Sequence, residues 1–188
     1  RRTAEVAQAQ GLNVYNGFLQ DAKYENEFFD VIFLGDIIEH VTSPHDLLKE
    51  CTRVLKKGGV IVISTPNLDC SWSKSTFWLY CLFKIPWSSV TPPYHLFQFS
   101  HGNLYRLMRT YTYTETDAFF LRPPRLMYEL GSLHLLKQFK QKKTLGRFFF
   151  MLLSFKLYVI FYFFDILITP LKDKDFSMVT FYSKSETA

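Results

Sequence analysis

The chain has 188 residues, 48% hydrophobic and 21% charged, which is the composition of a globular protein with a core and excludes a disordered chain. Its formal net charge of +5 suits an anionic membrane surface as well as a nucleic acid, so charge alone does not decide between these partners. Its three cysteines have neither a CxxC pair nor metal-ligand spacing, which favours a reducing compartment over a disulfide framework.

The first predicted element is a helix that Gly11 ends, followed by a short strand over residues 12–15. No N-cap residue precedes this helix, so its first backbone N–H groups would lack a partner. We therefore expect the sequence to start inside a longer protein.

A strand, a helix and a second strand are predicted next. The apolar run of residues 28–35 (FFDVIFLG) is typical of a parallel strand covered on both faces. Ser43 is an N-cap residue for a helix with apolar side chains at helical spacing, and Gly58-Gly59 is expected to end this helix. Residues 60–65 (VIVIST) are a second buried strand. Parallel strands joined in this way bind ligands beyond their carboxyl ends.

The second half of the chain is less regular. Residues 68–99 form a long connection, which is typical of a lid or a substrate wall. Ser100 is placed to cap a short helix, and residues 114–121 and 176–183 have the composition of strands.

Four short motifs between Phe29 and Asn67 resemble those of the class I S-adenosylmethionine-dependent methyltransferases. The resemblance is to the broad group that includes the ubiquinone-type O-methyltransferases. The motifs are FD at the start of the first buried strand, EHV after it, RVLKKGG at the end of the helix and STPN at the end of the second strand. Further on, PPYHLFQFS resembles the segment that supplies part of the substrate side in this group. The resemblance covers most of residues 1–121 and recurs in the last strand.

This resemblance implies a Rossmann-like α/β sheet without its first two strands and glycine-rich cofactor loop, and with a hydrophobic helical insert before the last strand. The expected division is a methyltransferase core over residues 1–121, which includes a substrate-side loop at 68–99. An insert over residues 122–175 and a last core strand with a tail over 176–188 follow.

The resemblance also implies S-adenosyl-L-methionine as the cofactor, bound by Phe18, Leu19, Gly35, Asp36 and Glu39. Gly35 and Asp36 end the first buried strand and are expected to border the methionine part of the cofactor. The family often has Asp or Thr at the position of Phe18, which cannot accept a hydrogen bond from the adenine amino group. Adenine binding would then depend on backbone groups at Leu19.

Methyl transfer to a hydroxyl needs aligned reactants and a base, and two histidines are the candidates for catalysis. His95 is the preferred base, since it lies on the loop expected to cover the acceptor. His40 either acts as a base or orients the substrate, or it fixes the loop by capping and packing. Because Glu39, His40 and His95 lack a metal-ligand spacing, we expect no metal site.

The insert contains an apolar run, residues 148–169, that is long enough to span a bilayer. Five basic residues precede it: Lys137, Lys140, Lys142, Lys143 and Arg147. A narrow polar stripe follows the run: Ser154, Tyr158, Tyr162, Asp165 and Thr169. Two charges in the run, and the expected return of the last strand to the sheet, count against a single span. We therefore expect residues 137–170 to lie in a membrane interface; the alternative is a buried helix or a homodimer contact.

The expected function is methyl transfer, at oxygen, to a small-molecule, glycan or lipid-linked acceptor. The expected location is the cytoplasm, including the cytoplasmic face of the membrane, with no nucleic-acid partner. The residues of this chain alone are expected to be inactive. The alternative function is a catalytically inactive, methyltransferase-like binding module docked at a membrane.

Overall fold

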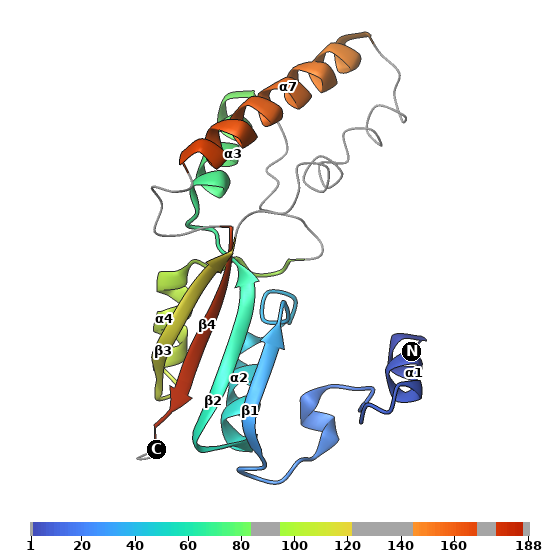
Figure 1. The fold of residues 1–188 in the computed structure, drawn as a ribbon, viewed down its shortest axis with the longest axis vertical. Helices are drawn as coiled ribbons and strands as arrows, with labels where there is room; N and C mark the ends of the chain where they lie inside the picture. The colour runs from blue at the N-terminus through green and yellow to red at the C-terminus, as the bar shows by residue number, and fades with distance from the viewer. Residues whose placement is uncertain (1, 84–94, 122–144, 169–175, 186–188) are drawn as a thin grey trace.

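A computed structural model describes residues 2–83, 95–121, 145–168 and 176–185 (Figure 1). The first half contains α1 (Arg2–Ala9), the short 3-10 helix η1 (Leu19–Ala22), β1 (Phe29–Gly35), α2 (Pro44–Val54) and β2 (Leu55–Pro66). The second half contains α3 (Ser71–Phe83), α4 (His101–Arg109), β3 (Tyr113–Leu121), α7 (Leu145–Ile168) and β4 (Ser177–Lys184).

The four strands form one sheet in the order β1-β2-β4-β3 (Figure 1). β1 is parallel to β2, whereas β4 is antiparallel to both β2 and β3. This arrangement confirms the predicted α/β class and the return of the last strand to the sheet. The strand expected over residues 12–15 is wrong, because these residues take no part in the sheet.

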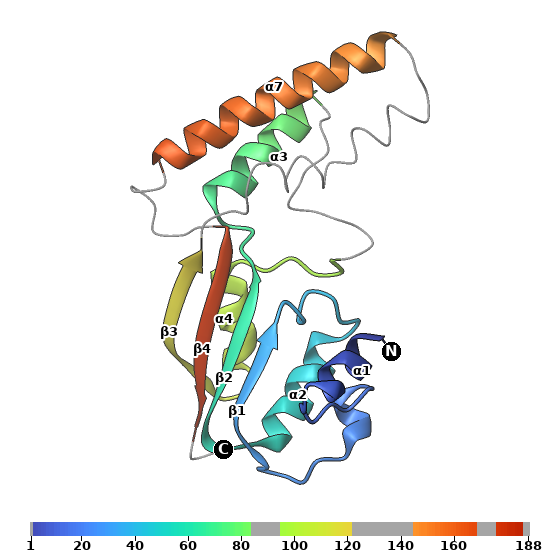
Figure 2. The same ribbon diagram turned by 45° about the vertical axis from the view of Figure 1, so that its right-hand side comes forward.

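One face of the sheet holds the core. Helices α2 and α4 pack against it, and their buried side chains meet alternate residues of the strands (Figure 2). They include Leu48, Cys51, Ile61, Ile63, Leu104, Met108, Met178 and Tyr182. The expectation that β1 is covered on both faces is wrong for the described residues, since Val31 and Phe33 are 58% and 63% exposed. Both helices lie on the same face, so nothing described covers the other.

Helix α2 begins as predicted and ends earlier than predicted. Ser43 Oγ accepts a hydrogen bond from Asp46 N at 3.2 Å, which caps the first turn. The helix ends at Val54, and Gly58-Gly59 lies inside β2 instead of ending the helix. At this end the ammonium of Lys184, the last residue of β4, donates to the carbonyls of Thr52 and Leu55 at 2.8 and 2.7 Å. The buried lysine therefore satisfies carbonyls that a helix end leaves without partners.

Helices α3 and α7 form a separate pair, the α3–α7 lobe, beyond the end of the sheet where β1 and β2 finish (Figures 1 and 2). Residues 71–83 of the expected long connection are thus helical, not loop. Trp72 and Leu79 of α3 are fully buried against Leu157 and Phe161 of α7. Among the described residues, no helix meets the length and hydropathy that crossing a membrane requires.

The predicted domain limits at residues 121 and 175 stay predictions. The basic segment before Arg147, and the predicted stripe residue Thr169, lie outside the described residues.

Candidate functional site

The turn that starts at Asp36 follows β1 and is hydrogen-bonded to the carboxyl end of β2. Asp36 N donates to the carbonyl of Ser64 at 2.9 Å, and Ser64 Oγ donates to Asp36 Oδ1 at the same distance. Asp36 also has a φ of 50°, in the left-handed region that Asp tolerates better than most residues. The pairing of Gly35 with Ser64 and this turn therefore fix where the chain leaves the sheet.

Glu39 is a buried carboxylate at this edge, with 2% of its surface exposed. Its Oε2 accepts a hydrogen bond from the buried Thr65 hydroxyl at 3.0 Å. Its Oε1 is buried and has no hydrogen-bond partner. Burial disfavours the ionised form and raises the pKa of Glu39, against the opposing effect of its hydrogen bonds.

His40 and His95 lie beside this carboxylate. The backbone N–H groups of Leu96 and Phe97 donate to the Glu39 carbonyl at 2.8 and 3.1 Å, which holds residues 95–97 against the turn. The rings of His40 and His95 are 4.8 Å apart between centroids, and His40 Nε2 is 3.9 Å from Glu39 Oε1. His95 Nδ1 is buried without a hydrogen-bond partner. Burial, followed by the proximity of His40, lowers the pKa of His95.

The predicted site residues fall into two groups. Asp36, Glu39, His40 and His95 come together at the carboxyl ends of β1 and β2, although they span 60 residues of sequence. Phe18 and Leu19 lie on the separate segment at the start of η1, where Phe18 is 77% exposed and Leu19 packs against the core. The roles assigned to all these residues stay predictions.

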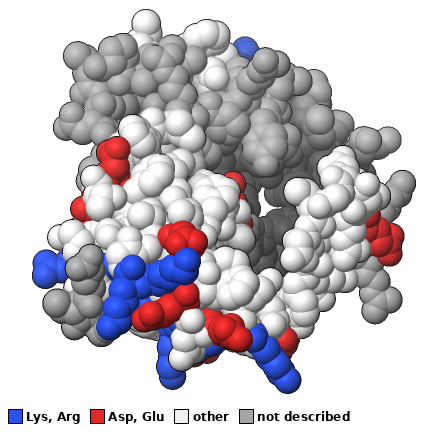
Figure 3. All heavy atoms as spheres, turned by 60° about the horizontal axis from the view of Figure 1, so that its bottom comes forward, with Lys and Arg blue, Asp and Glu red and all other residues white. Residues whose placement is uncertain are grey.

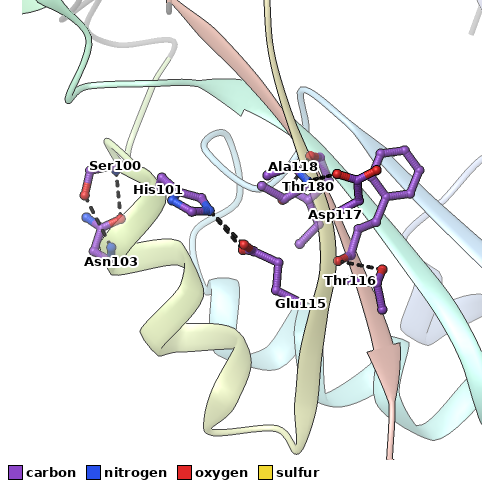
Figure 4. Close-up of polar contacts among 10 residues, drawn as sticks. Ser100, His101, Asn103, Glu115, Thr116, Asp117, Ala118 and Thr180 are labelled. Carbon is purple, nitrogen blue, oxygen red and sulfur yellow. Dashed lines mark hydrogen bonds and ion pairs between the residues drawn. The ribbon is translucent and has the colours of Figure 1, made fainter. Parts of the chain in front are cut away.

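Sequence reasoning missed Thr65 and Ser64, which orient the two carboxylates. It also missed a second pair, formed by His101 at the start of α4 and Glu115 of β3 (Figure 4). His101 Nε2 lies 3.0 Å from both oxygens of Glu115. Only the strand alternation of β3, which turns Glu115 towards α4, would have indicated this contact.

Comparisons with known proteins find similar sequences for the first third of the chain. Residues 1–63 match the family model of a methyltransferase domain. The ubiquinone biosynthesis O-methyltransferase of Maricaulis maris is 36% identical over 70 residues, which are 35% of this chain and 28% of that protein. The enzyme of the same name from Glaesserella parasuis is 34% identical over 58 residues, which are 31% of this chain and 25% of that protein. Over its first third, the chain is therefore similar in sequence to methyltransferases.

Solved structures show that the fold is shared with known proteins. A SAM-dependent methyltransferase from Thermotoga maritima superposes with a TM-score of 0.59 at 16% identity, covering 98% of this chain and 70% of that one. The [4+2]-cyclase SpnF superposes with a TM-score of 0.56 at 14% identity, covering 97% of this chain and 61% of that one. The fold prediction is thus confirmed, and the predicted family is matched over residues 1–63. S-adenosyl-L-methionine is the cofactor of the SAM-dependent methyltransferase that this chain resembles. The matched part spans about a third or less of the length of the curated relatives.

Proposed function

We propose that the protein transfers a methyl group from S-adenosylmethionine to a hydroxyl oxygen of a small-molecule, glycan or lipid-linked acceptor. The observation that carries this proposal is the cluster of Asp36, Glu39, His40 and His95 at the carboxyl ends of two parallel strands. Ligands of open α/β sheets bind at this edge. The similarity to ubiquinone biosynthesis O-methyltransferases favours oxygen as the atom that is methylated.

Each residue of the site has a proposed role. Gly35 and Asp36 border the methionine part of the cofactor, and Glu39 lies next to them on the same turn. Phe18 and Leu19 contact the adenine. His95 receives the proton of the acceptor hydroxyl through the ring nitrogen that lacks a partner, and His40 orients the acceptor. The reaction itself needs only an in-line arrangement of the acceptor oxygen, the methyl carbon and the sulfur.

Calorimetric titration of the full-length protein with S-adenosylmethionine tests the cofactor. We expect binding that Asp36→Ala weakens and Asp30→Ala leaves unchanged. Asp30 is the matched control, because it lies at the other end of β1 and is exposed, paired only with Lys56. Absence of binding in the full-length protein would end the proposal.

The alternative is a methyltransferase-like module without activity. The superposition on the [4+2]-cyclase SpnF supports this alternative, because it shows that the fold also occurs in a protein that is named for a reaction other than methyl transfer. Binding of the cofactor without transfer of radiolabelled methyl groups to a cell extract would support the module.

We further propose that the α3–α7 lobe contacts a membrane surface. Two polar side chains of α7 lie on its inner face: Ser154 is buried and donates to the Phe150 carbonyl, and Tyr162 packs edge-on against Trp72. Many apolar side chains of the lobe, in contrast, are exposed. The most exposed of those described are Trp78 and Leu82 on α3 and Phe149, Ile160, Phe163, Phe164 and Leu167 on α7. A helix in water shows the reverse pattern, so this face is suited to an apolar surrounding.

The charge distribution supports the same orientation. Five basic residues lie in the sequence between 137 and 147, next to α7, and such a segment is attracted to anionic lipid head groups. At the end of the molecule away from the α3–α7 lobe, basic and acidic side chains are mixed (Figure 3). The carboxyl ends of β1 and β2 point towards the lobe (Figure 2). A lipid-linked acceptor would therefore reach the site from the membrane side.

Flotation of the full-length protein with liposomes tests the membrane contact. We expect it to float with vesicles that contain anionic lipid, and less with neutral ones. The double variant Ile160→Ser and Leu167→Ser should float less, because these side chains are 61% and 75% exposed. Val31→Ser, a change of an equally exposed apolar residue on the sheet, is the matched control. Equal flotation of all three proteins would contradict the proposal, and a change in sedimentation mass instead would indicate a homodimer contact.

A further inference from the structure

We infer that Glu39, His40 and His95 form a binding site for one divalent transition-metal ion. One ligand atom from each residue lies within 4.8 Å of the others. No family model or relative assigns a metal to these residues, and their spacing in the sequence gave no indication of one.

The separation of the ligand atoms fits an ion better than it fits direct contact. His40 Nε2 and Glu39 Oε1 are 3.9 Å apart, which is too far for a hydrogen bond. Two ligands that each lie about 2.0–2.1 Å from a tetrahedrally coordinated ion are separated by about 3.3–3.4 Å. The observed distance is about half an ångström longer, a difference that a rotation of the His40 ring would remove. The His40 side chain is 42% exposed, so it has room to rotate onto an ion.

Two buried polar atoms of these three residues have no hydrogen-bond partner in the described part of the chain. They are Glu39 Oε1 and His95 Nδ1. Buried polar atoms are normally paired, so each unpaired one needs an explanation. An ion bound between the three residues would satisfy both atoms at once, and it would compensate the charge of a carboxylate that is 2% exposed.

The residues around the three ligands hold them in place. Thr65 donates to the second oxygen of Glu39, which leaves Oε1 directed towards the histidines. The Leu96 and Phe97 N–H groups fix the segment of His95 on the Glu39 carbonyl. Hydrogen bonds of this kind orient ligands in metal sites and raise their affinity. The Asp36 carboxylate is close enough to affect the pKa values of both Glu39 and His95, and its negative charge favours a cation.

The ligand set indicates the class of ion. Two imidazoles and one carboxylate suit Zn²⁺, Fe²⁺ and related first-row ions, and three protein ligands leave coordination positions open. A role of this ion in methyl transfer, unlike its binding, rests on the proposed function. An acceptor hydroxyl bound at an open position would lose its proton to solvent more easily, because the ion stabilises the resulting oxyanion. That oxygen would then attack the methyl carbon, and the carbon–sulfur bond would break with its electron pair on sulfur. His95 would act as a ligand in this case and not as the base.

Metal binding to the full-length protein tests the inference. The protein is stripped with EDTA, dialysed and titrated with Zn²⁺, and bound zinc is measured by equilibrium dialysis. We expect one ion per chain, and a loss of affinity of at least about tenfold in each of Glu39→Gln, His40→Ala and His95→Ala. His101→Ala is the matched control, since His101 also lies beside a carboxylate, and the described residues supply no third ligand there. It should bind zinc like the unchanged protein.

Several results would overturn the inference. They are zinc binding below about one ion per chain, equal affinity in the three ligand variants, or an equal loss in His101→Ala. If Glu39→Gln fails to fold, His40→Ala is the variant that decides, because His40 is exposed. Thermal melting shows whether the His40→Ala protein is folded. Titration with S-adenosylmethionine in EDTA separates this inference from the proposed function. Zinc binding without cofactor binding would overturn the function alone, and cofactor binding without zinc binding would overturn the metal site alone.

Discussion

Replacing Thr65 by valine removes the hydrogen bond that its hydroxyl donates to the Glu39 side chain while keeping the shape of the buried residue. Thr65 is fully buried, and its hydroxyl donates to Glu39 Oε2 at 3.0 Å. A hydrogen bond to a charged group contributes about 1.5–3 kcal/mol, and its loss leaves a buried carboxylate unpaired. We expect the free energy of unfolding to fall by about 2 kcal/mol, and the Tm by about 4–8 °C for a chain of this size.

A double-mutant cycle assigns this loss to the hydrogen bond. In a Glu39→Met background the carboxylate is gone, so Thr65→Val should cost less than about 0.5 kcal/mol in urea unfolding. An equal cost in both backgrounds would show that the valine acts through packing, and the account of the Glu39 environment given above would be wrong. A loss of Zn²⁺ affinity in Thr65→Val, measured in the same preparation, would connect this hydrogen bond to the proposed ion.

Three further predictions concern other parts of the fold. Burial raises the pKa of the Cys51 thiol to about 12, so brief iodoacetamide treatment of the native chain should modify the exposed Cys81 but not Cys51; mass spectrometry checks this. The hydrogen bond from Arg53 lowers the pKa of Glu50 below its usual 4.5, so this pair stabilises the fold above that pH and loses its effect as the pH falls through the lowered pKa. The stability difference between Glu50→Gln and the unchanged protein in urea should therefore shrink in acid, and a difference that grows would contradict the assignment. Lys184→Met removes the two hydrogen bonds that the ammonium donates to the carbonyls of Thr52 and Leu55, and it should lower the free energy of unfolding by about 2 kcal/mol. An unchanged urea midpoint would refute this.

Elements with local signals were predicted well. Ser43 and Ser100 cap α2 and α4 as expected, because an N-cap depends only on the next three residues. The helix α3 was missed, since its side chains show no regular apolar period and it is held by Trp72 packing on α7, more than 80 residues away. Gly58-Gly59 was taken as a helix stop, but these residues lie inside β2, between the positions where β2 pairs with Phe29 and Val31 of β1. Tertiary contacts overrode local preference in both cases.

The site was predicted in part for the same reason. Asp36 and Glu39 were predicted to lie at the carboxyl ends of the parallel strands, and the structure has them there. This prediction needs only the positions of the two strands in the sequence. The approach of His95 depends on hydrogen bonds between Glu39 and residues 96–97, which no sequence spacing reveals. The prediction that no metal binds rests on sequence spacing alone and stays a prediction; spacing does not describe a group such as His95, which approaches Glu39 and His40 from a distant segment.

The buried lysine at the end of β4 has a consequence for the order of folding. Its two acceptors belong to residues more than 120 positions earlier in the chain, and β4 itself lies between β2 and β3 in the sheet. β1, α2 and β2 leave the ribosome long before β4 is synthesised. Until then, one edge of β2 has no strand beside it, and the last carbonyls of α2 lack the hydrogen bonds from Lys184. Contacts of such high sequence separation slow folding and prolong the exposure of strand edges. We therefore expect the sheet to complete only after synthesis of residue 184, and a protein truncated before it to aggregate in a cell-free translation reaction.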